Sequence, residues 1–152
     1  MLPMDGDGKP VPFLISEFDQ RQARFSPDGH WVAYSSDESG VREVYVRSFS
    51  MNSAGTAVEV GGKWPISVGG GHTPRWRGDG RELYYLTSAL QLMAVEIATT
   101  PTFRVGPSHP LGYLTSVAFW AAADGRRFLS LGKAGGQEPY TVVLNWQSGL
   151  KK

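Results

Sequence analysis

Three Asp-Gly pairs are the first candidates for chemistry in this sequence of 152 residues. They are Asp28-Gly29, Asp79-Gly80 and Asp124-Gly125. Carboxylates that converge on one point can exchange protons or bind a cation, but aspartates in separate, well-spaced units do not form such a pair. Asp-Gly between two β-type runs is typical of a hairpin turn, because glycine supplies the positive φ and aspartate bonds its own backbone. We therefore interpret these pairs as structural turns.

Other candidate groups do not form a recognisable reaction centre. His30, His72 and His109 are scattered and lack the short spacing of zinc ligands. Residues 5–8 (DGDG) resemble the start of a calcium loop, but the twelfth position holds Ser16 instead of glutamate. There is no GxSxG nucleophile motif and no cysteine. The sequence predicts no catalytic residue, no metal site and no cofactor.

Composition and charge are those of a globular protein that lacks the strong positive charge needed to attract polyanions. The net charge is +1, with 41% hydrophobic and 19% charged residues, so neither nucleic acid nor a membrane surface is an expected partner. The N-terminal residues 1–9 are polar and glycine-rich, unlike a secretory signal, and no apolar run approaches about 18 residues. The absence of cysteine suits either redox compartment, so the localisation stays open.

The elements around the Asp-Gly pairs predict an all-β fold. Each pair follows a short β-type run and precedes an apolar one, and when the pairs are aligned Val32, Leu83 and Phe128 correspond, as do Ala33, Tyr84 and Leu129. Third strands are expected at 44–47, 92–95 and 141–144, and weaker fourth strands at 64–68 and 109–113. The segment 89–98 is rich in helix formers, but its place in the pattern favours a strand.

Four strands in about 45 residues is the period of a propeller blade. We expect a single domain with about three four-stranded blades. Its predicted parts are an outer strand at 10–15 that completes a blade, blade 1 at 20–68, blade 2 at 72–113 and blade 3 at 117–148.

The residues also resemble a known family. Residues 23–34 (ARFSPDGHWVAY) are similar to the TolB-like propeller repeat, a relative of WD repeats in which SPDG is the hallmark turn. Residues 69–76 (GGGHTPRW), 79–85 (DGRELYY) and 142–146 (VVLNW) resemble the last blades of propellers at the C-termini of bacterial serine/threonine kinases. The second and third turns lack the Ser-Pro, and no kinase motif is present. Such propellers are commonly six-bladed and often extracytoplasmic, so the resemblance implies that the chain is half of a six-bladed ring.

The resemblance implies a non-catalytic scaffold that binds a protein segment or a small ligand at the mouth of the propeller channel. Segments that enter the inner strands should line that mouth, flanked by 37–39. The candidate binding residues are Asp19, Gln20, Arg21, Gln22, Gly70, Gly71, His72, Thr73, Thr115 and Ser116.

Three blades cannot close a ring, so we expect either a homodimer or blades missing from a parent chain. In the homodimer, the strand at 10–15 would complete the third blade of the partner. Two other interpretations remain open: a truncated regulatory propeller of a bacterial serine/threonine kinase, and a metal-dependent, lactonase-like hydrolase.

Overall fold

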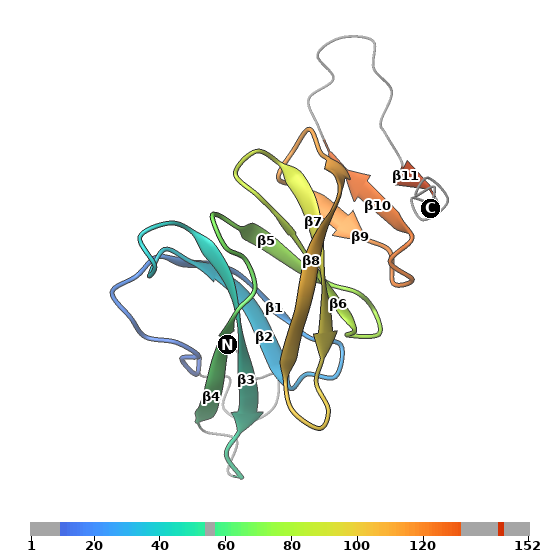
Figure 1. Cartoon of the computed structure of the whole chain (residues 1–152). Coiled ribbons are helices and arrows are strands. Elements are labelled where there is room, and N and C mark those ends of the chain that lie inside the picture. The colour runs from blue at the N-terminus through green and yellow to red at the C-terminus, as the bar shows by residue number, and fades with distance from the viewer. Residues whose placement is uncertain (1–9, 54–56, 132–142, 145–152) are drawn as a thin grey trace.

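The fold consists of β-strands arranged in three antiparallel sheets, and the part of the chain that the structure describes contains no helix (Figure 1). The computed structural model describes residues 10–53 and 57–131 and the short strand 143–144. The all-β prediction is confirmed. The strands are β1 (Gln20–Phe25), β2 (Trp31–Ser36), β3 (Glu43–Met51), β4 (Val58–Pro65), β5 (His72–Trp76), β6 (Glu82–Leu86), β7 (Gln91–Ala98), β8 (Arg104–Tyr113), β9 (Phe119–Ala121), β10 (Arg127–Ser130) and β11 (Val143–Leu144).

Each sheet follows chain order. The first sheet is β1-β2-β3-β4, the second is β5-β6-β7-β8, and the third is β9-β10-β11. Within the segment 89–98, which is rich in helix formers, residues 91–98 form β7, so the segment is a strand as the pattern predicted. The DGDG segment at 5–8, and the third unit beyond residue 131 except β11, lie outside the described residues.

Both fourth strands and the segment 10–15 differ from the prediction. The fourth strand of the second sheet, predicted at 109–113, begins earlier, at Arg104. The fourth strand of the first sheet begins earlier than predicted, at Val58, and ends at Pro65; its middle, Gly61-Gly62, carries no apolar pattern to reveal it. The segment 10–15 was predicted as an outer strand but is not a strand here. Pro10 and Pro12 lack the N–H that a sheet partner needs.

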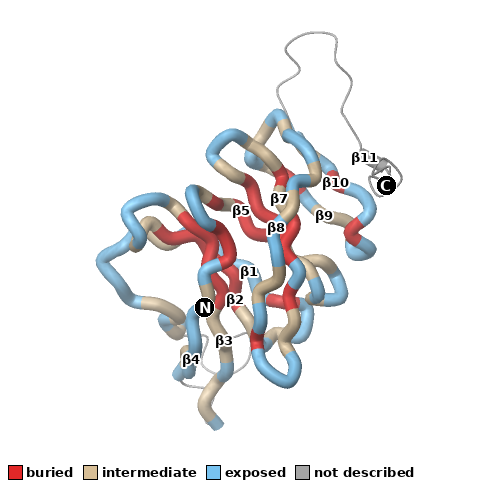
Figure 2. The backbone as a smooth tube through the Cα atoms, in the orientation of Figure 1, coloured by how far each residue is buried: buried red, intermediate tan, exposed pale blue. Residues whose placement is uncertain are grey.

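The three sheets stack face to face, with the second in the middle (Figure 2). Alternate residues of β6 face opposite neighbours. Leu83 and Tyr85 join the core shared with the first sheet, whereas Tyr84 and Leu86 join the core shared with the third. A strand covered on both faces reads as a continuous apolar run, which explains the sequence of β6.

The first strands of neighbouring sheets lie side by side, since β5 contacts both β1 and β9. Side chains of β5 donate hydrogen bonds to backbone carbonyls of these two neighbouring strands. Trp76 Nε1 donates to the Arg24 carbonyl at 3.2 Å, and Arg75 Nε donates to the Phe119 carbonyl at 3.2 Å. Filling these edge acceptors joins each sheet to the next and protects open β edges.

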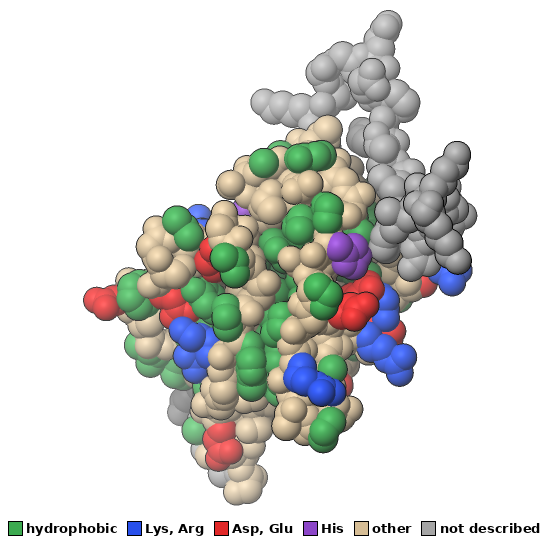
Figure 3. All heavy atoms as spheres, viewed as in Figure 1, with side chains coloured by type: hydrophobic (Ala, Val, Ile, Leu, Met, Phe, Trp, Pro, Cys, Tyr) green, Lys and Arg blue, Asp and Glu red, His purple; other side chains and the backbone are tan. Residues whose placement is uncertain are grey.

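Aromatic rings fill the space between the first two sheets on the side away from β1 and β5. The ring centroids of Trp31 and Phe103 lie 4.5 Å apart, as do those of Trp64 and Phe103. Apolar side chains follow the seam between β4 and β8 in the space-filling view, and charged side chains lie around it (Figure 3). The sheets therefore share a core along most of their width.

The three Asp-Gly pairs connect the first and second strands of their sheets with one geometry. The glycines have φ between 68° and 74°. Oδ1 of Asp28, Asp79 and Asp124 accepts the amide hydrogen of the residue two positions later, at 3.0–3.1 Å. Aspartate and glycine thus have the turn-forming roles that their chemistry favours.

Candidate functional site

A cluster of polar groups lies at the end of the first two sheets opposite the Asp-Gly turns. It forms where β1 and β5 begin and where β2 ends, so it gathers residues from both sheets. We call it the polar end; its members are Asp19, Arg21, Gln22, Ser35, Asp37, Arg42, Glu43, Ser67, Gly70 and Thr73.

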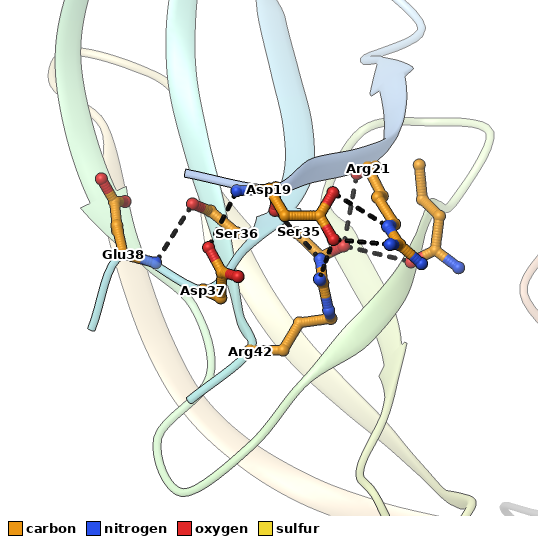
Figure 4. A network of polar contacts seen from close by, with 8 residues as sticks. Asp19, Arg21, Ser35, Ser36, Asp37, Glu38 and Arg42 are labelled. Atoms are coloured by element: carbon orange, nitrogen blue, oxygen red, sulfur yellow. Dashed lines mark hydrogen bonds and ion pairs between the residues drawn. The ribbon is translucent and has the colours of Figure 1, made fainter. Parts of the chain in front are cut away.

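Asp19 is the centre of the charged part of the polar end (Figure 4). Its Oδ2 lies 2.6 Å from Arg21 Nη2 and 2.7 Å from Arg42 Nη2. Its backbone amide donates to Asp37 Oδ1 at 2.9 Å. The hydrogen bonds from Arg21 and then Arg42 hold the pKa of Asp19 below its ordinary value. The carboxylate is therefore ionised at neutral pH and fixes both guanidinium groups.

Gln22 and Thr73 join the two sheets at equivalent positions of β1 and β5. Gln22 Nε2 donates to Thr73 Oγ1 at 2.9 Å, and the Thr73 amide donates to Gln22 Oε1 at 2.8 Å. The Ser35 hydroxyl adds a third bond to Gln22 Oε1, at 3.1 Å. Both residues have positive φ, 60° and 55°, at irregularities in the strand pairing. Non-glycine residues in this conformation are strained, and such strain is concentrated at functional positions.

The glycine-rich loop before β5 is held by a buried carboxylate. Glu43 accepts a hydrogen bond from the Ser67 hydroxyl and another from the Gly70 amide, the latter at 2.9 Å. The Gly71 amide donates to the Arg42 carbonyl at 2.8 Å. A Cβ on Gly71 would overlap the Ser67 side chain, so the tight path of this loop requires glycine.

The structure brings together most, but not all, of the predicted binding residues. Asp19 to Gln22 and Gly70 to Thr73 lie in or beside the polar end, where His72 Nδ1 is 2.9 Å from Thr73 Oγ1. Burial lowers the pKa of His72, which favours a neutral imidazole at neutral pH. Thr115 and Ser116 are separate: Ser116 Oγ accepts from the Ala118 amide, and the hydrogen bonds of the polar end, within the described residues, do not extend to them.

Sequence reasoning missed Ser35, Arg42, Glu43 and Ser67. One signal could have revealed Glu43, because a carboxylate at the start of an apolar strand covered on both faces must find hydrogen-bond donors. Nothing in the local sequence indicates that Ser67 would supply one of them.

The polar end offers hydrogen-bonding groups and charges from two neighbouring sheets. In the residues that the structure describes, no group of three or more His, Asp or Glu side chains is placed to hold a metal ion. Among those same residues, no helix is long and apolar enough to cross a membrane. Arg21 points its exposed guanidinium outward beside Gln22 on β1, where a ligand can reach both.

Comparisons with known proteins leave the family undetermined. A scan against protein-family models gives no match, and a search among curated proteins gives none either.

Proposed function

We propose that the chain is a binding scaffold of the β-propeller type, in which the stacked sheets act as blades and the polar end recognises a short protein segment. The observation that carries this proposal is the pair of hydrogen bonds between Gln22 and Thr73, which we call the Gln22–Thr73 joint. These bonds hold two strained residues in place where two neighbouring inner strands begin. Residues on such rigid supports can bind a partner without much loss of conformational entropy.

The arrangement of the sheets supports the propeller part of the proposal. The sheets follow chain order, stack through shared apolar cores and place their first strands side by side. In a propeller, first strands line the central channel and loops at its mouth carry the binding residues. β1 is exposed over almost its whole length, so its side chains are open to a ligand.

The chemistry of the polar end favours an extended peptide. Backbone groups and polar side chains of a peptide can pair with an exposed guanidinium and with the β1 edge, as in other modes of peptide recognition that use strands. Asp19 holds two arginines, so a peptide carboxylate can share them.

Selection of random peptides on the immobilised full chain tests this function. We expect enriched peptides whose binding, measured by calorimetry, weakens at least tenfold in Arg21→Gln. The matched control is Arg126→Gln, an exposed arginine beside the third Asp-Gly turn at the opposite end of the strands, which should bind normally. Equal weakening in both variants, or enrichment of no peptide, would contradict a binding site at the polar end.

A further inference from the structure

The third sheet exposes an apolar face on the side away from the second sheet. Trp120 and Leu129 are cross-strand partners on β9 and β10 and are 48% and 51% exposed. Leu131 follows on the same side and is also 51% exposed. Side chains of this size and type are rarely left together on a surface without a partner.

Positions in the other two sheets indicate what should cover this face. When the Asp-Gly pairs are aligned, Leu129 corresponds to Ala33 and Tyr84. Ala33 is fully buried in the core between the first and second sheets, and Tyr84 is fully buried in the core between the second and third. Each residue faces the following sheet. Leu129 therefore occupies the position that a following sheet covers.

The residues on the other side of each interface between sheets also occupy corresponding positions. Leu83 and Phe128 correspond in the alignment, and each faces the preceding sheet; the Phe128 ring centroid lies 4.9 Å from that of Tyr84. The corresponding residue of the first sheet is Val32. It lies on the face turned away from the second sheet, which we call the far face and which also contains Tyr34, Tyr45 and Phe49.

We propose that a second copy of this chain supplies the missing neighbour, with the third sheet of each copy packed on the far face of the other. This inference rests on the proposed propeller arrangement. The contact between the copies would repeat the packing found between neighbouring sheets within one copy. Leu129 of one copy would lie against Val32 of the other. A two-fold axis makes both contacts identical, so the assembly closes and covers the exposed faces of both third sheets.

The segment 10–19 lies over part of the far face and must move aside for this contact. Phe13 lies over the far face, with ring centroids 6.4 Å from Tyr34 and 6.0 Å from Phe49. A cleft of about 340 Å³ lies between residues 12–14 of the segment and the first sheet, where residues 20–23 and Tyr34 line it. Ile15 and Phe18 remain 86% and 42% exposed. Within one copy Val32, Tyr34 and Tyr45 are only 3%, 2% and 6% exposed, so the proposed contact requires the segment to be displaced from the far face.

Light scattering on the full chain tests the pairing. We expect the mass of two chains for the wild type and of one chain for Leu129→Asp, with the circular dichroism spectrum unchanged because Leu129 is half exposed within one copy. The matched control is Val68→Asp, which changes a residue that is 94% exposed in the loop between β4 and β5. This variant should keep the mass of two chains. A folded wild type with the mass of one chain, or a paired Leu129→Asp, would overturn the proposal.

Cysteine cross-linking tests the arrangement, since the chain contains no cysteine. We expect a mixture of Val32→Cys and Leu129→Cys chains to form a disulfide-linked pair under mild oxidation, and each variant alone to form little. Cross-linking of Leu129→Cys with itself would place the two third sheets together and contradict the proposed contact. Peptide binding at the polar end is measured separately, so loss of pairing with retained binding would overturn this inference alone.

Discussion

At the scale of single residues, the turns show how one local geometry is used in different surroundings. Gly29 and Gly125 have nearly the same φ, 74° and 68°. A Cβ on Gly29 would meet no atom within 4 Å, whereas a Cβ on Gly125 would overlap the Tyr84 hydroxyl and lie 2.6 Å from Arg77 Cδ. Glycine is thus needed at Gly29 for its backbone conformation alone, and at Gly125 for close packing of the second and third sheets as well.

Alanine substitutions at these two glycines should therefore differ in cost. We expect Gly29→Ala to lower the free energy of unfolding by about 1 kcal/mol, the cost of a left-handed conformation with a side chain. Gly125→Ala should lower it by roughly 3 kcal/mol, because overpacking is added to that cost. Urea denaturation of both variants measures the difference. Equal losses would show that the packing of Gly125 against Tyr84 and Arg77 has no energetic weight.

Asp79 gives a prediction for acid stability. The hydrogen bond from Arg77 lowers the pKa of Asp79 to about 2, from an ordinary value of 3.8. Because the folded-state pKa is the lower one, the stabilisation is fully present above pH 4 and is lost as the pH falls toward 2. Asp79→Asn keeps the turn acceptor but removes this titration.

The measurement is denaturant unfolding of the wild type and Asp79→Asn between pH 6 and pH 2. The stability advantage of the wild type should shrink as the pH falls through this window. Parallel pH dependences would contradict an ionised Asp79 held by Arg77.

At the scale of elements, the strands differ in how far the sequence could predict them. The apolar runs of β2, β6 and β7 and the Asp-Gly turns were predictable, because burial on both faces and positive φ each leave a clear pattern. β4 was misplaced because Gly61-Gly62 interrupts any such pattern. The segment 10–15 has apolar residues but no strand partner within the described chain, so its composition alone suggested a strand.

The polar end was predictable only in part, since it depends on how two sheets meet. The expected position of Gln22 and Thr73 came from their places before the inner strands. Their mutual hydrogen bonds require the particular offset of β1 and β5 in space, which no local pattern encodes. Glu43 and Ser67 are also far enough apart in sequence that only the fold unites them.

The Gln22–Thr73 joint can be tested by removing the side-chain amide of Gln22. Gln22→Ala leaves the buried Thr73 amide without its acceptor, and it should lower the free energy of unfolding by about 2 kcal/mol. Gln22→Glu should recover much of the loss, because a carboxylate can accept from both the amide and the hydroxyl of Thr73.

Thermal or chemical denaturation of the two variants distinguishes these expectations. Gln20→Ala is the matched control, since its side chain donates to Ser16 Oγ in an exposed contact, and it should change stability by less than about 0.5 kcal/mol. A loss in Gln22→Ala no larger than in Gln20→Ala would mean that the joint does not stabilise the contact between the sheets.

At the scale of the whole molecule, stability should be graded from the second sheet outward. The second sheet shares one core with the first sheet and another with the third, so β6 and β7 are covered on both faces. β1 is exposed over nearly its whole length, and β4 is a mostly exposed edge strand. Local openings need little energy where few apolar contacts are broken, and approach the global free energy of unfolding where both faces are packed.

Native-state hydrogen exchange followed by NMR should therefore find the slowest amides in β6 and β7. The amides of Leu83 to Leu86 and Leu92 to Val95 should exchange only through global unfolding, with the denaturant dependence of the whole molecule. Those of β4 should exchange through smaller openings, since only one edge of that strand is paired. If β1 or β4 exchanged as slowly as β6, the two cores would not be the source of stability, because strands outside them would be equally resistant to opening.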